Sequence, residues 1–391
     1  MPAGSRPGAL RLTSGQPVTL KPLGCSRKNC NCSAWIDKSR LEAAWHAAGF
    51  VNTAPAVGAG VRQERLSSYE EFVELEKETP MKPAFRPYQT EDDFWRMREF
   101  LRQVFLLNNL LERSWHVARL DYARWHTCLN CAHVHLEDVA YLWETGGQIT
   151  AILMPDGGRG EAHLCVHPGL RTLELEEAML TVAEERLAAV RPDSSHRLWA
   201  WAPEQDTLRQ GIFSRRGYTK DNWPEYQWRR QLDSPIPDVP VAPGYTLRSL
   251  GDGLELLERC YASGLGFHDG DIKIAVENRH DPTWYRNIQT APLYRRDLDL
   301  VAIAPDGAIA AFCTIWFDDV TRSAYFEPVA TVPAHQRNGL GKALMTEGLR
   351  RLQRMGATTA FVGGYSLAAN ALYQSVMGSD HELYEPWVKE W

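Results

Sequence analysis

The sequence predicts a mixed α/β fold in which one domain occurs twice in tandem, after an N-terminal extension. Residues 139–154 and 300–317 each place apolar runs around a Gly-Gly or Asp-Gly turn, which is typical of a β-hairpin. Each hairpin is followed by an apolar strand that ends at a proline, Pro168 or Pro333, and then by a helix. These prolines lie 165 residues apart, which indicates two copies of one α/β unit.

Two further landmarks repeat at nearly the same spacing. The strand-ending arginines Arg86 and Arg248 lie 162 residues apart. The aromatic residues Phe213 and Tyr373, each near the end of the last helix of its copy, lie 160 residues apart. An internal repeat explains this agreement, so the order of elements in one copy predicts their order in the other.

Composition places the domain boundaries. Residues 1–82 begin Gly-, Pro- and Ser-rich and show little periodicity, so we expect an N-terminal extension that is partly disordered. Residues 233–243 (DSPIPDVPVAP) carry four prolines, which favour an extended linker because proline lacks a backbone N–H. The sequence therefore predicts one domain over residues 83–232 and a second over residues 244–391.

Charge and hydropathy limit the class of protein. The 391 residues are 44% hydrophobic, carry a net charge of −6 and contain eight cysteines. A negative chain does not favour nucleic acid as a partner, and no apolar stretch approaches the ~20 residues of a membrane span. Without an evident export signal we expect reduced cysteines and a cytoplasmic protein, and the sequence does not indicate its oligomeric state.

The second copy contains a strand, a glycine-bearing turn and the start of a helix over residues 329–344. The first N–H groups of such a helix have no internal partner and lie at its positive end, where they can bind a phosphate. Gly339 and Gly341 let the backbone approach the anion, and Arg337 and Lys342 add cationic donors. The alternative is that the two glycines only form a tight turn.

Gln336, Gly339 and Gly341 match the pattern [Q/R]-x-x-G-x-[G/A], and this run resembles motif A of the Gcn5-related N-acetyltransferases (GNAT). The resemblance implies a GNAT fold and acetyl-CoA as co-substrate. It is strongest over residues 244–391, weaker over 83–232 and does not cover the extension. The residues that it implies for coenzyme binding are Val329, Ala330, Thr331, Gln336, Arg337, Asn338, Gly339, Leu340, Gly341, Lys342 and Ser366.

A second resemblance concerns the helix expected over residues 366–377. Its segment ANALY, residues 369–373, is similar to GNAT motif B, N-x-x-A-x-x-L-Y-x-x-x-G-F. This likeness implies that Tyr373 protonates the departing thiolate of coenzyme A. The sequence departs from the motif at Ser366, where asparagine is usual, and at Met377, where glycine is expected. A tyrosine with only a packing role is the alternative.

An amine must lose its charge before it attacks a thioester, which requires a base of near-neutral pKa. Glu327 lies on the strand that enters motif A, between apolar residues that could raise its pKa. Related acetyltransferases often place a catalytic glutamate on this strand. Asp318 and Asp319 compete as groups that could bind a cationic substrate, and Glu327 could instead be a solvated carboxylate at the strand edge.

The first copy lacks the same chemistry. Glu174 and Glu176 stand where the second copy has its two glycines, and their charges would repel a pyrophosphate. Phe213 replaces the tyrosine. We therefore expect a degenerate half that supports the active half or walls its substrate cleft. This plan resembles that of mycothiol synthases, although nothing in the sequence identifies mycothiol as the substrate.

Three segments have alternative interpretations. Cysteines 25, 30 and 32, and the run His126, Cys128, Cys131, His133 and His135, contain zinc-type ligands without a standard spacing, so ordinary reduced cysteines compete with a metal site. Residues 115–125 (WHVARLDYARW) could line a substrate cleft or simply pack inside the domain.

These observations predict an N-acyltransferase that moves an acetyl (acyl) group from acetyl-CoA to an amine of a small molecule or peptide by direct attack. One alternative is a non-catalytic protein that senses coenzyme A or binds a partner. Another is an enzyme with two active halves. The acceptor amine and the length of the acyl chain are not encoded in any motif that we can identify.

Overall fold

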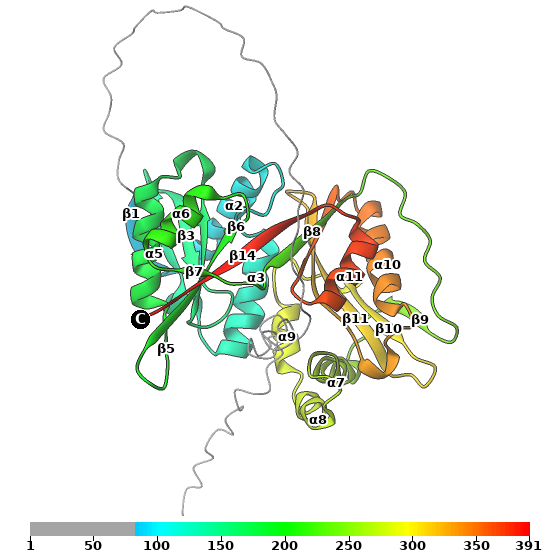
Figure 1. The fold of residues 1–391 in the computed structure, drawn as a ribbon. Helices are drawn as coiled ribbons and strands as arrows, with labels where there is room; N and C mark the ends of the chain where they lie inside the picture. Colours follow the sequence, from blue (N-terminus) through cyan, green and yellow to red (C-terminus); the bar gives the residue numbers. More distant parts are fainter. Residues whose placement is uncertain (1–82) are drawn as a thin grey trace, which may run out of the picture.

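The computed structural model describes residues 83–391; the predicted extension, with Cys25, Cys30 and Cys32, lies outside the described residues. The described part is one continuous fourteen-stranded sheet flanked by helices, a mixed α/β architecture that confirms the predicted fold class (Figure 1). The main path of the sheet runs β1-β2-β3-β4-β6-β14-β8-β13-β12-β11-β10-β9. No helix among residues 83–391 is both long and apolar enough to cross a membrane.

The first half follows the predicted order of a hairpin, an apolar strand and a helix. Its strands are β1 (Ala84–Pro87), β2 (Tyr141–Thr145), β3 (Gln148–Met154), β4 (Glu161–Val166), β5 (Ala189–Val190), β6 (His196–Pro203), β7 (Thr219–Lys220) and β8 (Glu225–Gln231). Its helices are α2 (Glu91–Leu107), α3 (Val117–Tyr122), the π-helix η1 (Ala123–Ala132), α4 (Leu136–Val139), the 3₁₀ turn η2 (Pro168–Leu170), α5 (Leu173–Arg186) and α6 (Thr207–Arg215).

The second half repeats this order after residues 233–245, which contain no helix or strand. Its strands are β9 (Thr246–Ser249), β10 (Asp299–Ile303), β11 (Ile309–Asp318), β12 (Ser323–Thr331), β13 (Thr359–Gly364) and β14 (His381–Glu390). Its helices are α7 (Glu255–Phe267), α8 (Ile272–His280), α9 (Thr283–Gln289), α10 (Leu340–Arg354) and α11 (Leu367–Met377), with 3₁₀ turns η3 (Arg296–Leu298) and η4 (Pro333–His335).

The two halves exchange their last strands. Strand β8 of the first half pairs with β13 of the second, and β14 of the second half pairs with β6 of the first. The exchanged strands also pair with each other, so they run side by side where the halves meet (Figure 1). No sequence pattern predicts this exchange, because both strands occur at the position in the chain that the repeat predicts.

Successive side chains of each strand point to opposite faces of the sheet, and this divides the core into two layers. On β11, Phe312 and Trp316 lie in a cluster shared by both halves, which includes residues of α2, α3, α7 and α9. Cys313 and Ile315, which point to the opposite face, pack under α10 and α11. On that same face of the sheet, α5 and α6 cover the first half. The shared cluster means that one apolar layer continues across the junction.

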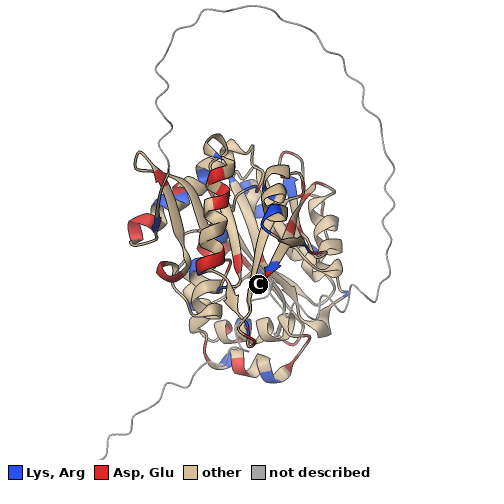
Figure 2. Ribbon diagram, turned by 60° about the vertical axis from the view of Figure 1, so that its left-hand side comes forward, with Lys and Arg blue, Asp and Glu red and all other residues tan. Residues whose placement is uncertain are grey.

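Each exchanged strand places a tryptophan in the other half. Trp228 of β8 is buried in the core beneath α10 and α11, and Trp387 of β14 is buried against Phe213 of α6. Burial of two large aromatic side chains across the junction ties the stability of one half to that of the other. Basic and acidic residues are interspersed in both halves (Figure 2), so the charges that matter at a binding site are local ones.

Candidate active site

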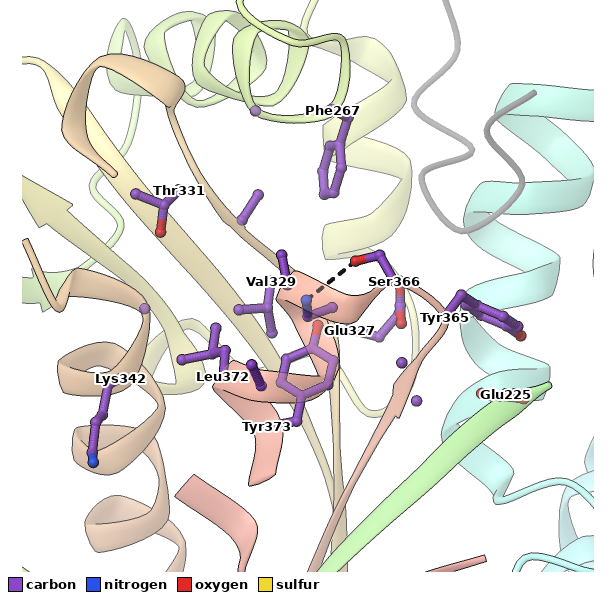
Figure 3. Close-up of a pocket in the computed structure, with 18 of the residues that line it drawn as sticks. Glu225, Phe267, Glu327, Val329, Thr331, Lys342, Tyr365, Ser366, Leu372 and Tyr373 are labelled. Carbon is purple, nitrogen blue, oxygen red and sulfur yellow. Dashed lines mark hydrogen bonds between the residues drawn. The ribbon is translucent and has the colours of Figure 1, made fainter. Parts of the chain in front are cut away.

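A cavity of about 950 Å³ lies where the two halves meet. Helix α3 and strand β8 of the first half line one end, and the start of α10 lines the other. Strands β12 and β13 and helix α11 lie between these ends (Figure 3). Its volume is in the range of cofactor and substrate sites, which favours a binding role for the junction.

Strands β12 and β13 separate as they enter the cavity. Their parallel pairing runs from Ser323–Thr359 to Tyr325–Phe361 and goes no further. Beyond this point β12 continues to Thr331, and β11 is its only strand partner among residues 83–391. On the other edge of residues 329–331 the Thr331 carbonyl accepts from the Gln336 side-chain amide at 3.3 Å, and the rest of this edge can pair with an extended ligand, as predicted for the pantetheine arm of coenzyme A.

The turn before α10 forms a cradle of backbone donors. Gly339 precedes the helix in the left-handed conformation, with φ of 71°, and no side chain caps the helix. Among residues 83–391, the backbone N–H groups of residues 337–342 have no protein acceptor. Several unpaired N–H groups at the positive end of a fifteen-residue helix fit a pyrophosphate, and a side chain at 339 would be strained.

Ten of the eleven residues expected to bind the coenzyme line the cavity. These are Val329, Ala330, Thr331, Gln336, Arg337, Gly339, Leu340, Gly341, Lys342 and Ser366. Asn338 is not in the lining, because its side-chain amide turns back to the carbonyl of His335 at 3.1 Å. The Ser366 hydroxyl caps α11 by accepting from the Ala369 N–H at 3.1 Å (Figure 3).

Glu327 lies on the cavity side of a β-bulge. The register of β11 against β12 shifts between Cys313 and Ile315, so Glu327 has no paired residue opposite it. Its carbonyl instead accepts a hydrogen bond from the indole N–H of Trp316 at 2.6 Å. Burial of the carboxyl, together with the negative charge of Asp156, raises the pKa of Glu327 to about 8. A carboxyl with this pKa is suited to accept a proton near neutral pH.

Tyr373 of α11 lines the same part of the cavity (Figure 3). The side chain is only 7% exposed. Burial and the nearby charge of Glu327 hold the pKa of the Tyr373 phenol above its usual value, so the phenol keeps its proton. A protonated phenol beside a base-like carboxyl gives the cavity one group that can donate a proton and one that can accept it.

The two aspartates considered as competitors lie elsewhere. Asp318 is fully buried, where Arg102 donates to it at 2.6 Å and the Thr321 hydroxyl donates at 2.7 Å. Asp319 is exposed beyond the end of β11. Neither belongs to the lining of the cavity.

The equivalent turn of the first half is closed by its own side chains. The Thr172 hydroxyl caps α5 by accepting from the Leu175 N–H at 3.1 Å. Glu176 is buried and accepts hydrogen bonds from Arg209, at 3.0 Å, and from Arg171. The carboxylate predicted to repel a pyrophosphate thus lies buried at this turn and binds both arginines.

Sequence reasoning missed most of the far end of the cavity. Arg119 and Glu225 form an ion pair there, and Asp156, Tyr325 and Tyr365 are further polar residues of the lining. Arg119 lies within the WHVARLDYARW segment, which the sequence predicts either to line a cleft or to pack inside the domain. The segment does both, because Arg119 lines the cavity and Leu120 lies in the core. No signal marked Glu225, because its place in the cavity depends on the strand exchange.

No group of three or more His, Cys, Asp or Glu side chains in residues 83–391 is arranged to hold a metal ion. Cys128 is a buried free thiol that donates to the Gly157 carbonyl. Cys131 is disulfide-bonded, so the expectation of reduced cysteines fails at this position.

Comparison with known proteins gives the family. A sequence model described as "Acetyltransferase (GNAT) family" matches residues 265–378. The curated mycothiol acetyltransferase of Kineococcus radiotolerans is 30% identical over 233 residues, which cover 57% of this chain and 71% of that protein. The chain belongs to the Gcn5-related N-acetyltransferase family. Acyl transfer is therefore its general chemistry.

Solved GNAT structures share the fold. A tandem GNAT protein from the clavulanic acid biosynthesis pathway matches with a TM-score of 0.55 and 16% identity, covering 79% of this chain and 98% of that one. A GNAT protein from Sphaerobacter thermophilus matches with a TM-score of 0.51 and 17% identity, covering 80% and 96%. At these identities the likeness concerns the GNAT fold alone.

Proposed function

We propose that this GNAT protein transfers an acetyl group from acetyl-CoA to an amine of a small molecule or peptide, by direct attack. The observation that carries the proposal is that one cavity contains the backbone cradle before α10, the free edge of β12, Glu327 and Tyr373. Each of these elements has a separate task in amine acylation.

The coenzyme would be held mainly by backbone groups. The unpaired N–H groups of residues 337–342 would bind the pyrophosphate, with Arg337 and Lys342 as further cationic donors. Residues 329–331 would pair with the pantetheine arm, which directs the thioester toward Glu327 and Tyr373. A backbone N–H of this strand would then polarise the thioester carbonyl.

Glu327 would accept the proton of the attacking amine, directly or through a water molecule. Its pKa of about 8 lies close to the operating pH, where a base combines a useful ionised fraction with sufficient basicity. The free amine then forms a C–N bond to the acyl carbon.

Tyr373 would complete the reaction by protonating the leaving group. As the C–S bond breaks, the electron pair goes to sulfur, and the phenol proton of Tyr373 neutralises the thiolate. The amide and free coenzyme A are the products, and Tyr373 recovers its proton from solvent while Glu327 releases the one it accepted.

The first half would take part without binding coenzyme. At its equivalent turn the buried carboxylate of Glu176 binds Arg171 and Arg209, and a carboxylate at this place opposes a pyrophosphate. We expect isothermal titration calorimetry to give one acetyl-CoA per chain. A second equivalent site would support the alternative in which both halves are active.

The decisive experiment is an amine-library screen that measures release of free thiol from acetyl-CoA by the purified protein. Acylation of at least one amine, lost in Tyr373→Phe and Glu327→Gln, is the expected result. Coenzyme binding without turnover across a broad library would instead support the non-catalytic alternative and overturn the proposal.

A further inference from the structure

The end of the cavity opposite the cradle is built around a buried ion pair. Arg119 of α3 donates through Nη2 to Oε1 of Glu225, the first residue of the exchanged strand β8. Glu225 is 1% exposed and Arg119 is 9% exposed, and both line the cavity. Tyr325 donates to the same Glu225 oxygen at 3.5 Å, and its ring lies under the Arg119 guanidinium.

The pair leaves one donor and one acceptor unused. Glu225 Oε2 and Arg119 Nη1 are buried without a hydrogen-bond partner among residues 83–391. Glu112 contacts the other side of Arg119, with its Oε1 3.4 Å from Arg119 Nε, and does not use Nη1. Buried charged groups normally satisfy their hydrogen-bonding capacity, so these two atoms indicate a polar ligand group.

The backbone of β13 is shaped around Glu225. A Cβ on Gly363 would lie 2.0 Å from Glu225 Oε1 and 3.0 Å from the Tyr325 hydroxyl. A Cβ on the next residue, Gly364, would lie 2.9 Å from the Tyr373 ring. Two consecutive glycines therefore bring the Glu225 carboxylate and the Tyr373 phenol against the same short stretch of strand. The ion pair thus lies beside the chemistry of the proposed reaction.

We propose that Arg119 and Glu225 position the acceptor amine by binding an uncharged group on it that both donates and accepts hydrogen bonds, such as a hydroxyl or a primary amide. This inference rests on the proposed function and names its substrate class. The group donates to Glu225 Oε2 and accepts from Arg119 Nη1.

The two unpaired atoms disfavour other groups. An ammonium can donate to Glu225 Oε2 but cannot accept from Arg119 Nη1. A carboxylate can accept from Arg119 Nη1 but cannot donate to Glu225 Oε2, so a second charge of either sign leaves one buried atom without a partner. A methyl group leaves both buried polar atoms without a partner. An uncharged group that both donates and accepts satisfies both atoms.

The test compares primary amines of equal chain length that end in methyl, hydroxyl, carboxamide, ammonium or carboxylate, over several lengths. We expect the wild-type protein to show a KM at least tenfold lower for the hydroxyl or carboxamide member at the best length. Glu225→Gln replaces the free acceptor by a donor, and should raise that KM at least tenfold while kcat changes less than threefold. The KM for the methyl-ended amine and the Kd of acetyl-CoA should not change.

Glu112→Gln is the matched control. It alters the same kind of contact with Arg119 but lies outside the cavity lining, so it should keep the preference for the polar amine. If Glu225→Gln fails to fold, Glu225→Asp retains the charge and withdraws the carboxylate by one methylene, and the same selective rise in KM is expected.

The outcomes separate the two proposals. A wild-type protein that acylates no amine contradicts the proposed function itself. A protein that acylates methyl-ended or doubly charged amines equally well or better, or a Glu225 variant that keeps the polar preference, overturns this inference and leaves the acyl transfer intact.

Discussion

The indole N–H of Trp228 donates to Oδ1 of Asn370 at 2.9 Å. Trp228 belongs to the exchanged strand β8, and Asn370 lies on α11, three residues before Tyr373. This bond connects the chain of the first half to the helix that carries the proposed proton donor. The halves therefore depend on each other at the site as well as in the core.

The exchange predicts that damage to either crossing strand destabilises the whole chain. Trp228→Ala and Trp387→Ala should each lower the free energy of unfolding by about 3–5 kcal/mol, because each removes a large buried side chain. Trp95→Ala, at a position that is 48% exposed, is the control and should have a much smaller effect. Chemical denaturation followed by circular dichroism measures all three. Two separate transitions in the wild-type protein would contradict the coupling.

The pKa of Glu327 predicts the pH dependence of catalysis. Because the base must be ionised, kcat/KM should rise with pH and level off above the pKa of about 8. The assay uses an acceptor amine that stays uncharged between pH 6 and 9, so that ionisation of the amine does not contribute to the pH dependence of kcat/KM. Glu327→Gln should lower kcat by roughly 10²–10⁴-fold and abolish the rise. A wild-type profile that is flat between pH 6 and 9 would argue against this role.

The same carboxyl predicts a trend in stability. Glu327 ionises near pH 4.5 when unfolded and near pH 8 when folded, so the folded state binds the extra proton between these values. The free energy of unfolding should therefore fall as pH rises from 4.5 to 8, by up to about 1.4 kcal/mol per pH unit. Glu327→Gln removes this dependence. The free energy of unfolding of the variant, relative to that of the wild type, should therefore be greater at pH 8 than at pH 4.5. Thermal melting at both pH values tests the sign.

Removal of the phenol at position 373 should affect turnover and spare binding. Tyr373→Phe keeps the buried ring but supplies no proton, so kcat should fall by roughly 10²–10⁴-fold. The Kd of acetyl-CoA, measured by calorimetry, should remain within about twofold of the wild-type value. An acyl donor with a more acidic thiol leaving group should restore part of the rate, whereas a purely structural defect would not respond to the leaving group.

The cradle before α10 should be sensitive to negative charge. Gly339→Asp places a carboxylate beside the unpaired N–H groups and should raise the Kd of acetyl-CoA at least tenfold. Gly307→Asp is the matched control, because Gly307 also has positive φ and open space around its Cβ but lies outside the cavity lining. Equal effects of the two substitutions on binding would show that backbone strain, and not charge at the cradle, is responsible.

The sequence by itself determined the class of fold, the repeat and most of the coenzyme-binding end of the cavity. These features are local. A hairpin depends on alternation around its turn, and the cradle depends on glycine at 339 and on the start of one helix, so a short window of residues contains the necessary information. The same is true of the lost cradle in the first half, where Glu176 replaces a glycine.

Only the tertiary structure decided which residues meet at the acceptor end. Glu225 occupies an ordinary position on the last strand of its half, and nothing in its neighbours indicates a binding role. It enters the cavity because β8 pairs with β13, and a pairing between strands more than a hundred residues apart is fixed by backbone hydrogen bonds and by burial of Trp228, not by a local pattern. Asp318 was a reasonable candidate because the sequence around it does not reveal its partner: the partly buried Arg102 that neutralises it lies on α2 of the other half.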